Sequence, residues 1–498
     1  MLLAFLASHA PAPAQSDLPG VWRGSPPEES PPPPRGAIHL PDLGDAAQAD
    51  LGPIQERRLG EAIMREVRRD PAYFDDAELT DYVNALGYRL VAASDDSRQA
   101  FDFFLVKDSM VNAFALPGGF IGIHTGLILA SDTESELASV MAHEIAHVTQ
   151  RHIARMLAQQ KQTQLLSIAA LVFGILAARS NPDIAGAAIA GSQAATVQSM
   201  LNFTREHERE ADRVGIQILD GAGYDVQAMP LFFEKLQRAT RIYESGAPSS
   251  SYLRTHPFSF ERMADLQSRA HAMRYRQVPD SREYQLARAK VRALTDAPRD
   301  AVAYFENLLQ ERRFGSEWAA RYGLAAALLA AKDPARARKE IDALRKSGPA
   351  HPMIETLAGQ VLLAGGDAAG ALRLYRDALR QYPTHRALIY DYADALLRTG
   401  DADAALKVAQ ERLQVAPNDY RGYLLQGRAY AALNRTMLAH QSRAEALVRV
   451  GNLRGAVEQL QIAVKAGDGT FHELSSAEAR LRELRRALDE QRKEQQGR

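Results

Sequence analysis

The sequence has no cysteine, which excludes disulfide bonds, thiol catalysis and thiolate metal sites. It also lacks an excess of either charge, since 60 Lys and Arg residues stand against 61 Asp and Glu residues and the formal net charge is -1. A broad nucleic-acid footprint requires a basic excess, so we expect no nucleic-acid partner. Any metal that the chain binds must therefore be held by His, Asp or Glu side chains.

The N-terminal 50 residues are rich in Pro, Ala and Gly and differ from the rest of the 498-residue chain, whose length predicts about three domains. Ala12-Pro13-Ala14 has the small-x-small form of a signal-peptidase site. This predicts a signal peptide over residues 1–14 and a Pro-rich linker over 15–50. The basic segment that usually opens a signal peptide is missing, so the alternative of no signal stays open.

The C-terminal half repeats with a period of 34 residues. Small residues recur in two columns and a Pro or Gly closes each unit, a pattern typical of helix pairs that approach closely and then stop. We therefore predict four tetratricopeptide repeats over 318–468, stacked as an α-solenoid, with a generic helical bundle as the alternative. Residues 271–317 are predicted to be connecting helices, and 469–498 a charged C-terminal helix. The three columns are Ala325, Gly359, Ala393 and Gly427; Ala337, Ala371, Ala405 and Ala439; and Pro349, Pro383, Pro417 and Gly451.

A candidate metal site lies in the first half of the chain, at His143-Glu144-Ile145-Ala146-His147. Helical residues four apart differ by about 40° in azimuth, so both imidazoles point the same way. This geometry suits two ligands of a zinc ion, with Glu144 placed to take a proton from water. Ser131 and Glu134 offer a capping box for the start of this helix. The alternative is a surface helix that happens to carry two histidines.

A hydrolytic zinc site needs a third protein ligand. A third histidine just downstream is ruled out, because Gln150 and Ile153 stand where it would be. Glu208 and Asp212 are four apart in a later helical stretch, so Glu208 can bind the metal while Asp212 accepts an N–H from a liganding histidine. Other polar residues of that stretch are His207, a rival ligand, and Glu206 and Glu210, which we expect on polar faces.

These motifs together resemble the zinc metallopeptidase family that includes the CAAX prenyl proteases and the heat-shock protease HtpX. The resemblance rests on HExxH followed about 60 residues later by Glu208-Arg209-Glu210-Ala211-Asp212. With the repeats added, the chain resembles exported members of the family that act in β-barrel assembly in the periplasm. The resemblance implies a mainly α protein, with a zincin-like α+β metallopeptidase domain and a small sheet over 51–270, and one Zn2+ per chain.

The segment before the metal helix matches the same family. Residues 112–126 are predicted to form a strand, a Pro-Gly-Gly turn and a second strand. In the family an edge strand pairs with the substrate backbone, which needs little side-chain selectivity. An ordinary hairpin that only supports the helix is the compatible alternative. The residues that the resemblance implies as substrate strand are Asn112, Ala113, Phe114 and Ala115.

A histidine before a proline, His256-Pro257, stands in a predicted loop. The resemblance implies that His256 can close the fourth zinc position and hold the enzyme latent, because a protein ligand there displaces the catalytic water. A loop histidine with a structural hydrogen bond is the alternative.

The apolar run Leu165 to Ala178 is too short to cross a membrane, for which about 20 residues are needed. We expect it and its continuation to form two helices over the active site, with membrane contact at most peripheral.

The leading functional hypothesis is a periplasmic zinc endopeptidase that degrades misassembled or stalled outer-membrane proteins. Its repeats would dock substrate or the outer-membrane β-barrel assembly machinery. The alternative is a chaperone or scaffold for outer-membrane protein assembly whose peptidase domain is largely latent. An integral prenyl-type protease is disfavoured because no segment is long enough to span the bilayer.

Overall fold

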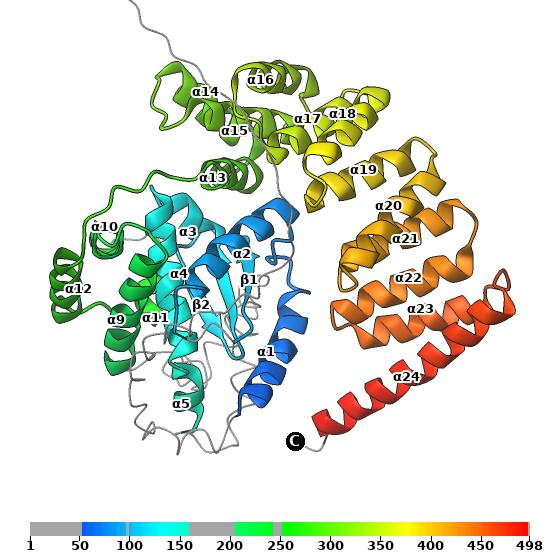
Figure 1. Ribbon diagram of the computed structural model, residues 1–498, viewed down its shortest axis with the longest axis horizontal. Coiled ribbons are helices and arrows are strands. Elements are labelled where there is room, and N and C mark those ends of the chain that lie inside the picture. The colour runs from blue at the N-terminus through cyan, green and yellow to red at the C-terminus, as the bar shows by residue number, and fades with distance from the viewer. Residues whose placement is uncertain (1–51, 96–98, 159–204, 243–250, 497–498) are drawn as a thin grey trace, which may run out of the picture. The chain divides into compact units, whose positions relative to one another are not determined.

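The computed structural model describes residues 52–95, 99–158, 205–242 and 251–496. The expected signal peptide and linker, and the two helices expected over the active site, lie outside these residues. Among the helices that the structure describes, none combines the length and the apolar character that a bilayer crossing requires. The described residues are mostly helical with one small sheet, which confirms the predicted fold class (Figure 1).

The sheet has three strands in the order β1-β3-β2, with β1 (Asp102–Val106) parallel and β2 (Ala113–Leu116) antiparallel to β3 (Phe120–His124). The predicted strand–turn–strand at 112–126 is therefore confirmed. Gly118 and Gly119 of the turn have φ of 76° and 86°, a conformation that glycine adopts without steric cost.

Two hydrophobic layers cover the sheet because side chains alternate along its strands. Phe103 and Leu105 of β1 face a core shared with α2 and α4, whereas Phe104 and Val106 face α1. The sheet is thus sandwiched between helices, and the helix carrying HExxH lies on one face. The helices of this half are α1 (Pro53–Val67), α2 (Ala77–Val91), α3 (Thr125–Ala130), α4 (Glu134–Thr149), α5 (His152–Ala158), α9 (Arg205–Gly221), α10 (Ala228–Ile242), α11 (Ser251–Thr255) and α12 (Phe260–Ala272).

The predicted repeats are four helix pairs, and the 34-residue period recurs in their backbone geometry. The residue before each second helix's cap has a positive φ: Lys332 at 64°, Gly366 at 83°, Gly400 at 86° and Asn434 at 58°. In the first three units an aspartate follows and accepts an N–H of the next helix, which satisfies a free donor of the helix start.

A further helix pair follows the four. The helices of the repeats are α15 (Glu317–Ala330), α16 (Pro334–Ser347), α17 (Pro352–Ala364), α18 (Ala368–Gln381), α19 (Arg386–Arg398), α20 (Ala402–Val415), α21 (Tyr420–Ala432), α22 (Thr436–Arg449), α23 (Leu453–Lys465) and α24 (Phe471–Gln496).

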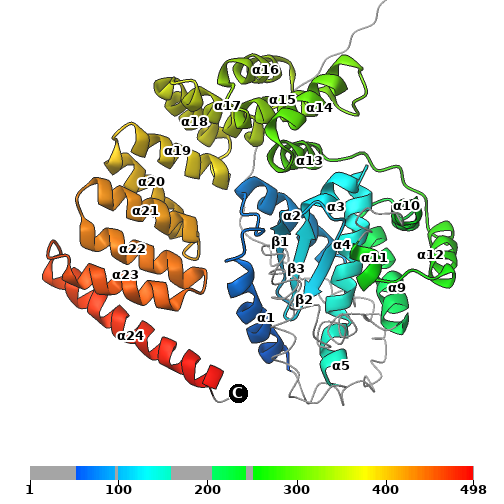
Figure 2. The ribbon, with the colours of Figure 1, turned by 180° about the vertical axis from the view of Figure 1, so that it is seen from behind.

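The connecting helix α13 (Arg282–Thr295) belongs to two hydrophobic cores and is followed by α14 (Pro298–Gln310). Tyr284 and Val291 of α13 pack in the core of the peptidase half, whereas Leu286 and Ala293 pack in the core of the early repeats. Figures 1 and 2 show α13 between α2 and α3 on one side and α15 on the other, in agreement with its contacts. The two halves are therefore joined by a shared helix rather than by a free linker.

A partly buried charge cluster joins α13 to the start of α2. The Lys290 ammonium lies 2.7 Å from a carboxylate oxygen of Asp76 and 2.7 Å from one of Glu78. Burial lowers the pKa of Lys290, but the two carboxylates outweigh this and hold it above its ordinary value. Burial likewise raises the pKa of Asp76, and the Lys290 ammonium outweighs it and lowers that pKa. The Lys290 ammonium and the Asp76 carboxylate thus stabilise each other's charged forms.

We predict that Lys290→Met lowers the free energy of unfolding by about 3 kcal/mol near neutral pH, because the buried carboxylate of Glu78 and the partly buried one of Asp76 lose their cation. The measurement is urea denaturation followed by circular dichroism. Lys407→Met is the matched control, since the Lys407 ammonium is exposed and 3.9 Å from Glu411; its effect should stay below about 0.5 kcal/mol.

The loss of unfolding free energy in Lys290→Met should become smaller as the pH falls. In the wild type the lowered pKa of Asp76 contributes stability above about pH 4 that is lost as the pH falls. In the variant, burial without the ammonium raises that pKa, so protonation relieves the cost. A difference between variant and wild type that stays constant from neutral pH to about pH 4 would contradict this account.

Candidate active site

The N-cap of α4, the helix that carries HExxH, lies two residues after the predicted cap Ser131. Thr133 is the N-cap, and its side chain accepts the N–H of Glu136. The predicted capping box of Ser131 and Glu134 is wrong, because the Ser131 hydroxyl donates to the carbonyl of Leu127 at the end of α3. The Glu134 carboxylate instead accepts from the Ser281 hydroxyl beside α13. A local bond to α3 thus holds the Ser131 side chain, and a tertiary contact holds that of Glu134.

The helix α9 crosses α4 at close range. A Cβ atom at Gly215 would lie 3.1 Å from the Cα atom of His143, so a larger residue would push the two helices apart. This contact brings Glu208 of α9 to the face of α4 that carries the two histidines. His143, Glu144 and His147 are fully buried and Glu208 is nearly so.

Four side chains converge in a group that could hold a metal: His143, His147, Glu208 and His256, with ligand atoms all within 4.8 Å of one another. Nε2 of His143 lies 3.0 Å from Nε2 of His147, and each is 3.5 Å from a Glu208 oxygen. The structure therefore brings together the three predicted ligands and the predicted fourth one.

The donor set fits a divalent cation. Two imidazole nitrogens and a carboxylate converge here, and such a group holds more hydrogen-bond acceptors than donors. Two imidazoles with one carboxylate are a common catalytic zinc set. Glu144 adds a further buried carboxylate, and neither of its oxygens has a well-formed hydrogen bond among the described residues.

The two buried glutamates of the site, Glu144 and Glu208, differ in the direction of their pKa shifts. Burial raises the pKa of Glu144, although the rings of His256 and His143 oppose this, which suits a proton acceptor near neutral pH. Burial also raises the pKa of Glu208, but His256 and His143 outweigh it and hold that pKa well below its usual range. Glu208 is thus a permanent anion, as a metal ligand must be.

Asp212 lies where the sequence predicts it, behind a candidate ligand. Its Oδ1 is 3.1 Å from Nδ1 of His143, so the ring can donate its second N–H away from the metal group. Burial lowers the pKa of His143, but Asp212 and Glu208 outweigh it and raise it to about 9. A metal that binds at Nε2 must therefore compete with a proton on this ring.

Arg262 of α12 was not found by sequence reasoning. Its guanidinium donates to both oxygens of Asp212 at 2.7 and 2.9 Å, lies 2.8 Å from Glu208, and donates to the Pro257 carbonyl at 2.7 Å. It is 2% exposed, so it neutralises two buried carboxylates and holds the loop after His256. No local sequence pattern indicates this role of Arg262, because its carboxylate partners are about 50 residues away along the chain.

His256 directly follows α11 and points into the group. Its Nδ1 is 2.9 Å from Glu208 and 3.4 Å from Nε2 of His143, and its Nε2 is 3.4 Å from Glu144. The ring stacks on Tyr252, whose backbone N–H donates to the carbonyl of Val111 ahead of β2. The imidazole thus touches both a candidate ligand and the candidate base.

The remaining polar residues of α9 differ in their surroundings. His207 is outside the metal group, and its ring stacks on His152 at 4.5 Å. Glu210 contacts His152 and Arg155 rather than standing alone on a polar face. Burial lowers the pKa of His152 to about 4. The structure also places His152 against His147, with 3.0 Å between their Nδ1 atoms.

The strand β2 lies at the edge of the sheet, paired with β3 alone. Ala113, Phe114 and Ala115 belong to it, and Asn112 precedes it and accepts an N–H from His124. The Ala115 backbone is close enough to the Glu144 carboxylate to lower its pKa. The predicted substrate strand is therefore next to the candidate base.

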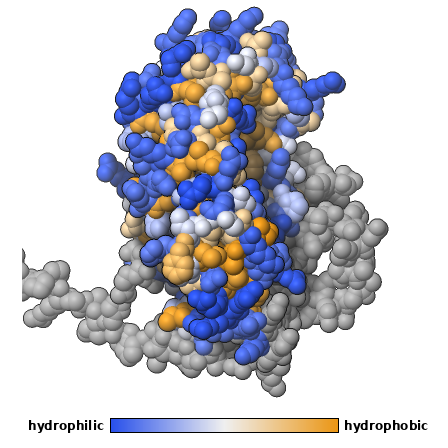
Figure 3. Space-filling view, turned by 90° about the vertical axis from the view of Figure 1, so that its right-hand side faces the viewer, coloured by the Kyte–Doolittle hydropathy of each residue, from blue (hydrophilic) through white to orange (hydrophobic). Residues whose placement is uncertain are grey.

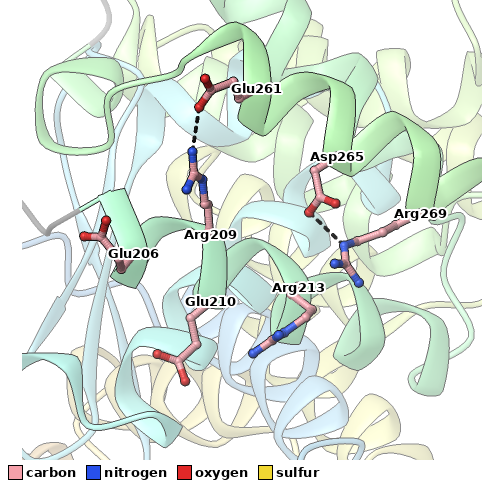
Figure 4. A pocket seen from close by; sticks show the side chains of 7 residues that line it. All are labelled: Glu206, Arg209, Glu210, Arg213, Glu261, Asp265 and Arg269. Carbon is pink, nitrogen blue, oxygen red and sulfur yellow. Dashed lines mark hydrogen bonds and ion pairs between the residues drawn. The ribbon is translucent and has the colours of Figure 1, made fainter.

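A charged pocket of about 660 Å³ lies on the far side of α9, between it and α12 (Figure 4). Arg209 of α9 pairs with Glu261 of α12 across it, and Arg269 pairs with Asp265 along α12. None of the four residues of the metal group lines it, but Glu210 does. The pocket thus borders the site through that carboxylate.

We predict that Arg262→Met lowers the free energy of unfolding by about 3–5 kcal/mol, because Asp212 and Glu208 stay buried without their cation. Arg269→Met is the matched control on the same helix, with an exposed i,i+4 pair that is worth about 0.5 kcal/mol or less. Thermal unfolding measures both. Equal melting temperatures for the two variants would contradict the assigned role.

Comparisons with known proteins agree with the two halves of the fold. The model of peptidase family M48 matches residues 77–270, and the tetratricopeptide repeat model matches residues 295–361 and 362–429. The mitochondrial metalloendopeptidase OMA1 of Arabidopsis thaliana is 30% identical over 174 residues, 35% of this chain and 32% of that protein. The peptidase half is thus shared with relatives beyond bacteria.

Two bacterial relatives are similar over nearly the whole chain. The β-barrel assembly-enhancing protease of Yersinia pestis is 34% identical over 462 residues, 92% of this chain and 93% of that protein. That of Escherichia coli (strain K12) is 36% identical over 427 residues, 85% of this chain and 86% of that protein. Because the similarity takes in both the metal group and the repeats, this chain belongs to the β-barrel assembly-enhancing proteases, metallopeptidases of family M48.

Proposed function

We propose that this metallopeptidase is a zinc-dependent endopeptidase of the periplasm that degrades misassembled or stalled outer-membrane proteins. The observation that supports it most is the convergence of His143, His147 and Glu208 around one point, with the buried carboxylate of Glu144 beside them. Two imidazoles and a carboxylate favour zinc over calcium or magnesium, which prefer oxygen ligands alone.

In this proposal His143, His147 and Glu208 hold one Zn2+. When bound, the metal supplies a Lewis acid for a water and for the peptide carbonyl. Glu144 takes the proton of that water and passes it to the leaving amine, a role that its raised pKa supports. Asp212 keeps the Nδ1 proton of His143 in place, so that Nε2 is free to bind the metal.

The substrate is proposed to bind as an extended strand along β2. An edge strand has unpaired backbone groups that can pair with an incoming peptide whatever its side chains. Asn112, Ala113, Phe114 and Ala115 would form this ladder, with the amide of Ala115 next to Glu144. This mode suits unfolded chains of many sequences, as stalled outer-membrane proteins are.

The repeats are proposed to dock substrate or the outer-membrane β-barrel assembly machinery. Support comes from the repeat family and from the names of the relatives. Figure 3 shows apolar areas among hydrophilic ones on the side of the later repeats. The later repeats also carry exposed apolar side chains, which fit a protein partner. They are Val415, Leu424, Ile462 and Phe471.

His256 is proposed as an inhibitory fourth ligand. Its Nδ1 lies with the three ligands, where it would take the position that water needs, and its Nε2 faces Glu144. The same observation favours the alternative function, a chaperone or scaffold for outer-membrane protein assembly with a largely latent peptidase. Restoration of outer-membrane assembly in a deletion strain by Glu144→Gln would favour this alternative.

We predict that Glu144→Gln keeps the metal but lowers cleavage of an unfolded protein by about 10²- to 10⁴-fold, because only the proton carrier is lost. Glu208→Gln should lower the zinc content itself, because it removes a charged ligand. Elemental analysis and a gel-based cleavage assay measure both, with Glu478→Gln on α24 as the control. Cleavage by Glu144→Gln at the wild-type rate would refute the mechanism.

We predict that His256→Ala raises basal cleavage. The increase is about tenfold if binding of the imidazole to the metal is favourable by about 1.4 kcal/mol over binding of water. The comparison uses an unfolded substrate at matched zinc occupancy, with the exposed His472→Ala as control. A rate at or below that of the wild type would leave His256 as a structural or substrate-binding residue.

A further inference from the structure

A second polar chain leaves the metal group on the side of His147, away from Asp212 and Arg262. The ring of His147 turns its Nε2 toward His143 and Glu208, at 3.0 and 3.5 Å. Its other nitrogen, Nδ1, lies 3.0 Å from Nδ1 of His152. Both rings are fully buried, so each ring nitrogen must find its partner inside the protein.

The chain continues from His152 to the surface. Nε2 of His152 lies 3.1 Å from a carboxylate oxygen of Glu210, and the same oxygen accepts from Arg155 at 2.9 Å. Glu210 lines the charged pocket of Figure 4, and its side chain is 26% exposed. The polar chain thus runs from a candidate metal ligand to a solvated carboxylate.

A local backbone feature places His152 beside His147. Arg151, between α4 and α5, has φ of 53°, a left-handed conformation that is unfavourable for a residue with a side chain. Without this turn α4 would continue, and residue 152 would stand about 140° from residue 147, since each residue turns a helix by about 100°. The turn bends the chain back, so that the two rings meet.

One proton can be assigned to each hydrogen bond between His147, His152 and Glu210. Only one proton fits between the two Nδ1 atoms, and His147 must supply it if its Nε2 lone pair is to bind a metal. His152 then accepts at Nδ1 and carries its own proton at Nε2, which it donates to Glu210. Every link has one donor and one acceptor, and the carboxylate at the end is held by Arg155.

We propose that His152, oriented by Glu210, is a positioning residue that fixes the tautomer and the ring orientation of His147. The proposal rests on the metal site of the proposed function and adds to it a partner for the second histidine. His143 has such a partner in Asp212, held by Arg262. Each liganding imidazole is thus backed by a hydrogen-bonded chain that ends on an arginine, and both chains use carboxylates of α9.

The test measures metal affinity in the full-length protein, by competition with a chromophoric zinc chelator. His152→Phe keeps the ring volume and removes both nitrogens, and loss of a partner of this kind weakens metal binding by about 10- to 100-fold. His152→Asn should recover most of the affinity, since its amide oxygen can accept near the former Nδ1. Glu210→Gln should fall between His152→Phe and the wild type.

Two controls and a spectrum separate positioning from general damage. Glu206→Gln, one turn before Glu210 on α9 and exposed, and His472→Phe, on the exposed start of α24, should bind zinc as the wild type does. In Co2+-loaded protein, the visible absorption of His152→Phe should differ from that of the wild type, whereas that of His472→Phe should not.

The outcomes are distinct. Wild-type affinity and an unchanged Co2+ spectrum in both His152→Phe and Glu210→Gln would overturn the proposal and leave the proposed function intact. A wild-type protein that binds no zinc would overturn both. If His152→Phe fails to fold, Glu210→Gln decides the question, and wild-type affinity with an unchanged Co2+ spectrum in that variant would overturn the proposal.

Discussion

Burial of two carboxylates on one helix is the constraint on which the site depends. Glu208 and Asp212 of α9 are both nearly inaccessible to solvent, and unpaired charges in such a place cost several kcal/mol each. Arg262 supplies the missing cation through a two-pronged contact with Asp212 and a third contact with Glu208. Because Arg262 also holds the carbonyl of Pro257, the charge balance of the site and the position of His256 are set by one side chain.

A single helix likewise joins the two halves of the molecule. The helix α13 contributes side chains to the core of the peptidase half and to the core of the early repeats, and its Lys290 pairs with Asp76 and Glu78. The helix α2 also packs against α4, the helix of the metal group. The early repeats and the metal group are thus connected through two packed helices, α13 and α2.

Features that repeat along the sequence, and the geometry that they imply, could be predicted from the sequence. Residues 143 and 147 lie on one face of a helix because of helical pitch, and so do residues 208 and 212. The 34-residue repeat predicts helix pairs because small residues and prolines act locally, and the positive φ at Gly366 and Gly400 follows the same period. The turn at Gly118-Gly119 is equally local.

Contacts between distant segments were decided only by the tertiary structure. The capping box predicted at Ser131 follows from local spacing, but the Ser131 hydroxyl donates to Leu127 and the Glu134 carboxylate accepts from Ser281, which is far away along the chain. Arg262 and the link of His152 to Glu210 carry no local pattern, since their partners lie about 50 residues or more away. The sequence by itself determined which residues could bind a metal, because ligand type and helical spacing are local properties. Only the fold decided which charges neutralise them and which ring faces them, because those contacts depend on how α4, α9 and α12 pack.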